Sequence, residues 1–393
     1  MISRLQAGAA LVIVIWALAI ISAVVAAYFT RGMLEVYYTL EQRSETEARA
    51  LAQAGVTSCL QLFMADEDEV DIPGEDWFLA DEDALTSVSG DGTISVRVFD
   101  YGSRINLNLT GQPSLMLLFK DNAAAADALL DWLDEDNQAR AKGAEDEYYL
   151  SLDPPLTPAN GPFLCPEEVF LVKGIEDVRR IVENDTTVYG KANPNLITPQ
   201  VWATILRLAG IDPGLHEVLT EQFTDARQKA DRDGIVLFHA LEDLGQKIGR
   251  MTENEWKPLA PYLTFSGQIN PNFASERVLR VALDLLGLNP DKARAILELK
   301  QQNGPFKDLD GIHNLLDTDD EKLGVSMERL QQVFTLQTTM IGIDVVGYTK
   351  DRDLHRIAAV VERYHPRMES TRWRCRILYW REWPGQEFPL RPE

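Results

Sequence analysis

Cysteine is scarce in this chain, with three among 393 residues. Cys59, Cys165 and Cys375 are too few and too far apart for a disulfide framework, and their spacing matches no zinc-binding pattern. Because the number is odd, at most one bridge can form within the chain. We therefore expect either buried thiols or one optional disulfide, and both alternatives stay open at this point.

Positive charge is also in short supply. Lys and Arg number 38 against 61 Asp and Glu, so the formal net charge is −23. Phosphate backbones are bound mainly by clustered Lys and Arg, so this balance argues against a nucleic-acid-binding function. An acidic surface can instead keep the protein soluble and concentrate divalent cations.

Signatures of catalysis are missing as well. The 5 histidines are scattered, and none has a Ser or Cys partner at a recognisable spacing. The glycine-containing segments AGAA and GDG are too short to count as phosphate-binding loops or dinucleotide fingerprints. We therefore expect that the protein is not an enzyme.

One long hydrophobic run stands near the start of the chain. Residues 9–29 carry no charge, and a helix of that length spans roughly 31 Å, which matches the hydrocarbon core of a bilayer. A secretory signal has only about 7–15 apolar residues before its cleavage site. Helix-forming residues continue to about Met64, so the pattern predicts one helix of roughly 80 Å that leaves the membrane unbroken. A plain single-pass anchor would share this pattern.

Four segments alternate apolar and polar residues in the manner of strands. They are residues 92–108, 339–348, 355–364 and 372–380. The first lies before a mainly helical block of roughly residues 113–337, and the other three lie after it. We therefore predict an α+β protein in which a sheet domain is interrupted by a large all-helical insertion.

The helical block contains an internal repeat. An Asn-x-Asn opening precedes a leucine-spaced helix at Asn106, Asn193 and Asn270, and a second signal follows each, such as NGPF at residues 160–163. Asparagine side chains accept hydrogen bonds from free amides at helix starts, so we expect these residues to cap helices. The units resemble helix-hairpin-helix elements, which often hold DNA. The candidate hairpins, 171–178 and 286–293, have few glycines and mixed charge, which favours a packing scaffold or a protein-binding surface.

Carboxylates are concentrated in the segment DWLDEDNQARAKGAEDEYY, residues 131–149, which follows an apolar helix. Such a loop suits Ca²⁺, which binds about six to eight oxygen ligands, among them Asp and Glu carboxylates that contribute one or both oxygens. Asp134, Asp136 and Glu145 fall at positions one, three and twelve of an EF-hand, but Ala139 stands where that motif needs glycine. We therefore expect a calcium loop of another kind and no regular element within it. A solvated acidic turn is the alternative.

The opening of the chain resembles the signal of type IV pilins and pseudopilins. By this resemblance, a prepilin peptidase cuts after Gly8 and methylates the new amino terminus at Ala9. Most members carry glutamate at the fifth mature position, whereas this chain carries Ile13. In type II secretion the pseudopilin that lacks this glutamate is pseudopilin K. Its family also carries a D-W-x-D-x-D…G-A-E-D-x-Y-Y stretch that closely resembles the acidic segment of this chain, and a segment like PPLTPANGPF, which follows it here. The resemblance covers nearly the whole chain.

The resemblance implies a pseudopilin fold, a long N-terminal helix plus an antiparallel sheet, interrupted by the all-α insertion. We assign residues 1–8 to the leader, 9–30 to the transmembrane part of the helix, 31–110 and 335–393 to the pseudopilin domain, and 111–334 to the inserted helical domain. It also implies a structural Ca²⁺ site in the acidic loop. Its matching carboxylates are Asp134, Asp136, Glu145 and Asp146, with Asp131 as a further candidate.

The function implied is that of a minor pseudopilin at the tip of the type II secretion pseudopilus, which starts assembly with minor pseudopilins I and J and supports protein export across the outer membrane. A carboxylate inside an apolar fibre needs a partner, which in pilins is the amine of the subunit nearer the tip. Ile13 needs no such partner, so no subunit has to stand in front of this one.

The expected location is the inner membrane, crossed once, with the bulk of the chain in the periplasm. Other pseudopilins, the prepilin peptidase and exported proteins are the further partners implied. Two alternatives remain: a minor pilin of a related type IV filament, and a membrane-anchored periplasmic DNA-binding protein with helix-hairpin-helix elements.

Overall fold

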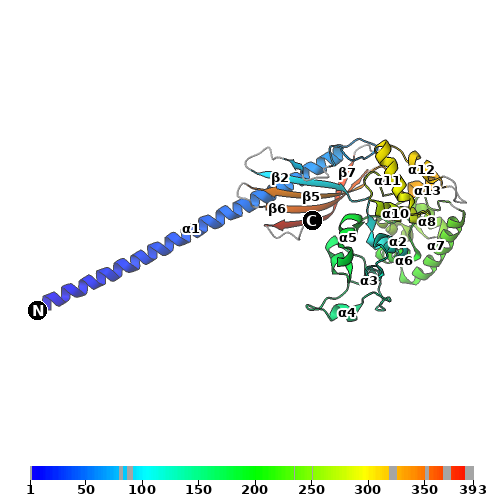
Figure 1. The fold of residues 1–393 in the computed structure, drawn as a ribbon. Helices are drawn as coiled ribbons and strands as arrows, with labels where there is room; N and C mark the ends of the chain where they lie inside the picture. Colours follow the sequence, from blue (N-terminus) through cyan, green and yellow to red (C-terminus); the bar gives the residue numbers. More distant parts are fainter. Residues whose placement is uncertain are drawn as a thin grey trace.

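The computed structural model describes residues 2–78, 83–85, 92–233, 235–249, 251–317, 325–349, 354–365 and 373–385, with side chains from Val12 on except those of 83–85 and 231. Helix α1 (Ile2–Ala65) is unbroken and projects as a single rod from the rest of the molecule (Figure 1). Every described side chain from Val12 to Arg43 is exposed. Within the described residues, this one helix is long and apolar enough to cross a membrane. The prediction of one continuous helix is confirmed.

A five-stranded antiparallel sheet packs against the second half of α1. Its order is β1 (Asp83–Leu85), β2 (Thr93–Asp100), β5 (Met340–Tyr348), β6 (Leu354–Tyr364) and β7 (Arg374–Pro384). Strands β2, β5, β6 and β7 lie within or overlap the four segments predicted from alternation, but β2 ends at Asp100, and the rest of the first segment, to residue 108, turns away from this sheet. β1 was not predicted, since three residues are too few to show a period.

Helix and sheet approach closely because glycine stands at the contact. A Cβ atom on Gly347 would lie 2.3 Å from the carbonyl oxygen of Ala48, and one on Gly55 would lie 2.6 Å from Cγ1 of Val345. Either contact would force the layers apart. The core between them consists of buried apolar side chains: Ala52, Val56, Cys59, Phe63, Trp77, Val96, Val98, Ile341, Ile343, Val345, Ile357, Ala359 and Val361.

All the remaining helices lie in sequence between β2 and β5 and form a lobe at the end of the sheet opposite the N-terminus (Figure 1). The fold class is confirmed as mixed helix and antiparallel sheet with a long N-terminal helix, whereas the domain limits remain predictions. The α-helices of this lobe are α2 (Gln112–Leu118), α3 (Ala123–Leu133), α4 (Asp146–Leu150), α5 (Arg179–Asp185), α6 (Pro199–Leu208), α7 (Pro213–Asp233), α8 (Leu241–Lys247), α9 (Glu253–Trp256), α10 (Glu276–Leu285), α11 (Lys292–Asn303), α12 (Asp310–Leu316) and α13 (Met327–Val333). Its short elements are the 3-10 turns η1 (Leu107–Leu109), η2 (Pro166–Leu171), η3 (Ile175–Val178) and η4 (Lys257–Tyr262) and the parallel pair β3 (Ile105–Asn106) and β4 (Thr186–Thr187).

The second asparagine of each Asn-x-Asn opening binds both peptide groups of a distant phenylalanine, an arrangement we call the asparagine clasp. Asn108 donates to the Phe163 carbonyl (3.0 Å) and accepts from the Phe163 amide (2.8 Å). The second clasp joins Asn195 to Phe238 at 2.7 and 3.0 Å. The third joins Asn272 to Phe306 at 2.9 and 2.8 Å. The three units thus share one tertiary contact, which ties the start of each unit to its second signal.

The expectation that these asparagines cap helices holds only at Asn106, whose side chain caps the 3-10 turn η1 by accepting from the Asn108 amide. Helices α6 and α10 are capped instead by Thr198 and Ser275, whose side chains accept from the amides three residues on. The first asparagine of each pair accepts from the amide of the second, as Asn193 does from Asn195 at 3.0 Å. This turn leaves the second side chain free to reach across the unit, which the local pattern does not reveal.

A buried arginine joins the long helix, the sheet and the third helical unit. Arg363 of β6 is fully buried; it forms ion pairs with Asp66, just after α1, and with Asp71 at 2.5 Å, and donates to the Thr338 carbonyl at 3.0 Å. The Asp71 carbonyl in turn accepts from Asn270 at 3.0 Å. Buried charges need partners, and Arg363 supplies one to Oδ2 of Asp71, whereas Oδ1 of that carboxylate is buried without a hydrogen-bond partner. The ion pairs of this Arg363 joint fix the lobe to the rod.

Candidate metal site

The acidic segment lies at the edge of the helical lobe, between helices α3 and α4. Helix α3 ends at Leu133, as the predicted apolar helix does, whereas α4 begins at Asp146 inside the segment. The expectation of a segment without a regular element of its own is therefore wrong at its C-terminal end. An aromatic contact holds the ends together, because the ring centroid of Trp132 lies 5.2 Å from that of Tyr149 and both side chains are buried.

Three of the predicted ligands meet in this loop. Asp134, Asp136 and Glu145 each place a carboxylate oxygen within 4.8 Å of the others. Glu145 is only 4% exposed, and neither of its carboxylate oxygens has a hydrogen-bond partner. Oδ1 of Asp134 is buried and unpaired as well. Unpaired buried oxygens are costly, and these three belong to two of the acids that meet here.

Burial and mutual repulsion perturb these acids. Burial, together with the charges of the neighbouring acids Asp131, Asp134, Asp136 and Asp146, raises the pKa of Glu145 to about 7. Burial also raises the pKa of Asp134, against the opposing effect of its hydrogen bond and charge interaction with Arg140. A cation placed between the carboxylates would relieve both effects.

The other two candidates have protein partners. Asp131 is fully buried and accepts hydrogen bonds from the Ala144 amide (2.8 Å) and from the amide (3.1 Å) and Nη1 (2.6 Å) of Arg140. It therefore shapes the loop from inside the lobe. The Asp146 carboxylate accepts from Nδ2 of Asn137 at 3.3 Å and is not in the group of three. Its role as a ligand stays a prediction.

Two residues that sequence reasoning missed complete the loop. Nη1 of Arg140 lies 2.6 Å from both Asp131 and Asp134, so one guanidinium partly neutralises the buried acids. Gly143 is required because a Cβ atom there would lie 1.7 Å from Oδ2 of Asp131. The signals of these residues were a basic residue and a glycine inside an acidic run, and the glycine is also part of the G-A-E-D stretch of the family motif.

This arrangement fits a hard cation. Oxygen ligands from carboxylates, without nitrogen or sulfur, are the donors that Ca²⁺ and Mg²⁺ prefer, and Ca²⁺ tolerates the irregular geometry of a loop. The three carboxylates would supply part of its shell and leave further positions for carbonyl or water oxygens. Cysteine does not contribute, since the three thiols are free and Cys59 is buried within the sheet domain, where burial raises its pKa to about 12.

The processing residues lie outside the described side chains. Gly8 and Ala9 are within the N-terminal turns of α1, so the predicted cleavage and methylation stay predictions. Ile13 is described, and its side chain is 68% exposed on the rod. No charged group replaces the missing glutamate at this position.

Comparison with known proteins points to one family. A family model described as "Type II secretion system (T2SS), protein K", its first domain, matches residues 114–180, which include the acidic loop. The "Type II secretion system protein K" of Aeromonas hydrophila is 29% identical over 201 residues, which cover 44% of this chain. The chain spans about 60% of the length of that curated relative.

A solved structure, the crystal structure of the GspK-GspI-GspJ complex from the type 2 secretion system of enterotoxigenic Escherichia coli, contains a chain that aligns with 91% of this one. That alignment covers 99% of the other chain, with a TM-score of 0.43 and 16% identity. The similarity is carried by the two sequence matches, which agree with each other and with the acidic motif. Residues 114–180 of this chain thus match the first domain of protein K of the type II secretion system, and the relative from Aeromonas hydrophila is a protein of the same name.

Proposed function

We propose that this protein is the minor pseudopilin at the tip of a type II secretion pseudopilus. It starts fibre assembly together with minor pseudopilins I and J and so supports protein export across the outer membrane. Its apolar helix lies first in the inner membrane, crossed once, with the sheet and the lobe in the periplasm. Other pseudopilins and exported proteins are its further partners, and the prepilin peptidase processes it at Gly8.

The single observation that carries this proposal is the chemistry of the exposed rod. The side chains from Val12 to Phe29 are uncharged and exposed, so they need either lipid or neighbouring helices around them. A subunit inside a fibre would need a carboxylate to meet the amine of the subunit in front of it. With Ile13 at that position, this chain gains nothing from a subunit in front.

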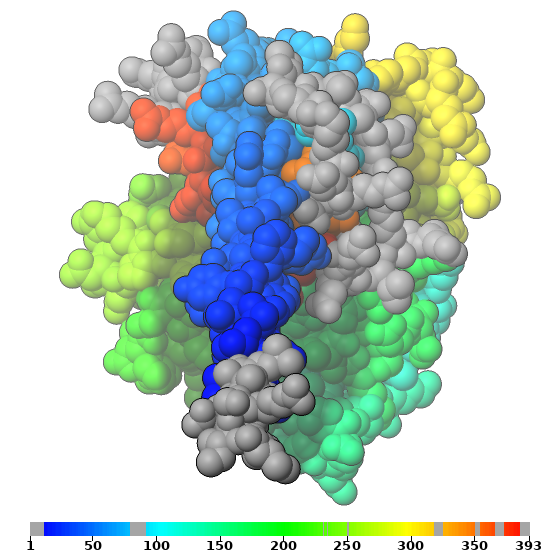
Figure 2. Space-filling view, turned by 90° about the vertical axis from the view of Figure 1, so that its left-hand side faces the viewer, coloured from blue at the N-terminus to red at the C-terminus, as the bar shows by residue number. Residues whose placement is uncertain are grey.

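The placement of the lobe supports the same position. It lies at the end of the sheet away from the N-terminus, in the direction in which a fibre would continue (Figure 1). Seen from the end of the rod, the lobe extends on both sides of α1 (Figure 2). A subunit stacked ahead in the fibre would have to share that space, whereas the tip leaves it free.

The acidic loop is proposed to hold one structural Ca²⁺ ion. Asp134, Asp136 and Glu145 would bind it, with Asp146 as a further ligand if its contact with Asn137 opens. When bound, the ion supplies positive charge to a cluster of acids that otherwise repel one another. Arg140 and Asp131 would keep the loop in place around the ion.

Co-purification tests the proposed assembly. The chain, expressed with minor pseudopilins I and J, is expected to form a stoichiometric complex with them, and the Ile13→Glu variant is expected to lose export while still forming that complex. The Val12→Glu variant, one position away on the rod, controls for the cost of an acid in the membrane. Failure to co-purify with I and J would contradict the proposal.

Two further measurements separate the alternatives. An unprocessed chain with an intact Gly8 would contradict both filament functions and favour the anchored DNA receptor. A gel-shift assay over a range of salt concentrations tests the receptor directly, since phosphate-driven binding weakens steeply as salt rises. Co-purification with type IV pilins in place of I and J would identify the related filament.

A further inference from the structure

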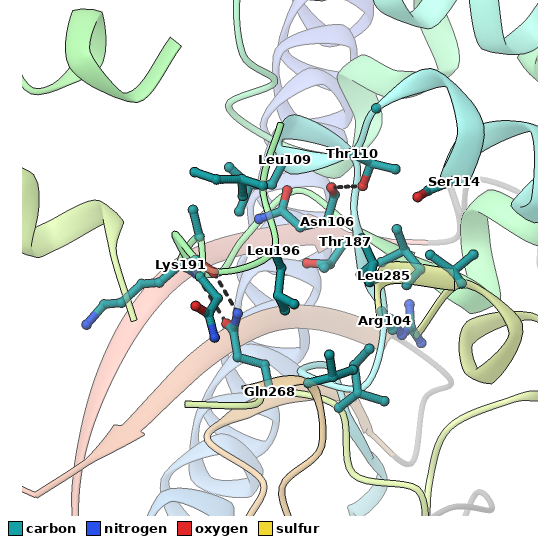
Figure 3. Close-up of a pocket in the computed structure, with 18 of the residues that line it drawn as sticks. Arg104, Asn106, Leu109, Thr110, Ser114, Thr187, Lys191, Leu196, Gln268 and Leu285 are labelled. Atoms are coloured by element: carbon teal, nitrogen blue, oxygen red, sulfur yellow. Dashed lines mark hydrogen bonds between the residues drawn. The ribbon is translucent and has the colours of Figure 1, made fainter. Parts of the chain in front are cut away.

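A cavity of about 310 Å³ lies where the helical units meet the end of the sheet. Its lining comes from the first unit (Arg104 to Ser114), the second (Thr187 to Thr198), the third (Gln268, Ile269 and the end of α10), α13 and the start of β5. Figure 3 shows these segments converging from different elements. Its size is within the range of small-molecule sites, about 300–1,000 Å³, and sites of this kind favour junctions between domains.

Most polar groups in this cavity are already paired with the protein. Gln268 donates to the Lys191 carbonyl at 2.6 Å and accepts from its amide at 3.3 Å, as drawn in Figure 3. The Thr110 hydroxyl donates to the Asn106 carbonyl at 2.5 Å. Leucines from three different units, Leu109, Leu196 and Leu285, add apolar surface. The walls therefore suit an apolar body.

Arg104 differs from the other charged groups that line the cavity. Its Nη1 donates to the carbonyls of Glu183 (2.9 Å) and Thr186 (3.5 Å), but it has no ion pair with a described residue. Lys191, the other cation of the lining, lies 3.5 Å from a carboxylate oxygen of Glu362. The lining contains one acid, Asp284 of α10.

The surroundings of Arg104 contain two acids, Asp100 and Asp185, whose charges act on it favourably, but neither forms an ion pair with it among the described residues. The guanidinium lies 4.7 Å from the ring centroids of Phe99 and Tyr101, so aromatic rings cover it. Burial lowers its pKa from the ordinary value. The planar fork of a guanidinium matches a carboxylate, which can take two parallel hydrogen bonds from it.

We propose that this cavity binds a carboxylate carried on an apolar body. The carboxylate would pair with Arg104, and the body would lie against Leu109, Leu196 and Leu285. At about 30 Å³ per water, the cavity has the volume of roughly ten water molecules, so the ligand has roughly ten non-hydrogen atoms. Asp284 disfavours a second negative charge, so a dicarboxylate or a phosphate ester would bind less well. A free organic acid and the last residue of a polypeptide share this chemistry.

Calorimetry with the full chain in detergent micelles tests the proposal, using 4-phenylbutyrate, its amide and the matching amine, with titrations into empty micelles subtracted. The acid is expected to bind saturably and the amide roughly tenfold more weakly, because a charge-assisted hydrogen bond is lost. The Arg104→Gln variant should bind the acid no better than the amide. Arg97→Gln is the matched control, since Arg97 also lies near the Phe99 ring but does not line the cavity.

A second variant keeps the test valid if Arg104→Gln fails to fold. Leu285 ends α10, lines the cavity and is 37% exposed, so Leu285→Trp can be accommodated while it narrows the space. Leu208 ends α6 in the second unit, is 41% exposed and does not line the cavity, so Leu208→Trp is its control. Only the first is expected to weaken acid binding.

The two sources of the carboxylate are separated by N-acetyl-leucine and its amide. Tighter binding of N-acetyl-leucine than of 4-phenylbutyrate would identify a chain end, and the reverse order would identify a free acid. Equal binding of acid and amide, preference for the amine, or unchanged binding by Leu285→Trp would each overturn the proposal.

Discussion

Glu145→Gln is expected to stabilise the folded protein when divalent ions are chelated at alkaline pH. The folded-state pKa of Glu145, about 7, lies above the ordinary 4.5, so the folded state binds this proton more tightly than the unfolded state. The resulting stabilisation is present below about pH 4.5 and is lost as the pH rises through 7. Glutamine is neutral at every pH, and its amide can donate to the neighbouring carboxylates.

The magnitude follows from the two pKa values. Their difference of about 2.5 corresponds to about 3 kcal/mol of unfolding free energy, which is the most that the ionised Glu145 costs at pH 8. The side chain is 4% exposed, so solvent screening reduces this cost little. The variant should therefore exceed the wild type by up to about 3 kcal/mol at pH 8 and by little at pH 5.

Urea unfolding of the full chain in detergent, with a chelator, measures this difference. Tryptophan fluorescence reports on the loop because Trp132 packs against its end. Glu147→Gln is the matched control: Glu147 is an exposed acid in the first turn of α4, and its loss should change stability by less than about 0.5 kcal/mol. With Ca²⁺ the order should reverse, since the wild type gains the binding energy of the ion and the variant loses a ligand.

Two results would refute this reasoning. A Glu145→Gln variant that is less stable than the wild type in chelator at pH 8 would mean that the carboxylate is favourably paired without an ion. A difference that does not change between pH 5 and pH 8 would mean that Glu145 does not titrate in the folded protein in this interval.

Three further substitutions test the joint, the clasp and the loop. Arg363→Met should lower the unfolding free energy by about 3–5 kcal/mol in chemical denaturation, because two buried aspartates lose their counterion. Arg374 is exposed, so Arg374→Met is the control and should have little effect. Asn272→Ala should cost about 2–4 kcal/mol by the same measurement, since both peptide groups of a buried phenylalanine lose their partner. Gly143→Ala should displace Asp131 and cost about 1–3 kcal/mol, with a matching loss of Ca²⁺ affinity in calorimetry.

Matched controls exist for the last two substitutions. Asn303 is exposed and makes no clasp, so Asn303→Ala should leave stability unchanged. A Cβ atom on Gly161 would meet only the Ala159 carbonyl oxygen, at an ordinary 3.7 Å, so Gly161→Ala should be tolerated. If Asn303→Ala and Asn272→Ala had equal effects, the clasp would not contribute to stability. If Gly161→Ala and Gly143→Ala had equal effects, the close approach at Gly143 would not matter.

Sequence patterns predicted the parts of this fold that repeat along the chain. The long helix and β2, β5, β6 and β7 were found because each continues one period for long enough. The strand order could not be predicted, because pairing depends on contacts across some two hundred residues of helix. The Asn-x-Asn pattern revealed three units and the capping role of Asn106 at η1. It could not reveal the clasp, because capping is a local property and the clasp joins distant residues.

In the candidate site, too, the local spacing could be predicted from the sequence, whereas burial and pairing could not. The spacing of acids placed Asp134, Asp136 and Glu145 in one loop, and they do meet. It could not show that Glu145 is buried without a partner, because burial depends on how α3 and α4 close over the loop. The hidden counterion Arg140 was likewise invisible, since an arginine among acids is ordinarily a surface residue.

The Arg363 joint couples the orientation of helix α1 to the position of the lobe. Helix α1 has 64 residues and so measures about 96 Å. Asp66 and Asp71, just after its C-terminal end, form buried ion pairs with Arg363. Tilting the rod by about 5° at its membrane end would therefore swing the lobe through roughly 8 Å. Any rotation or axial push applied to the base of this helix is therefore expected to reach the lobe as a displacement.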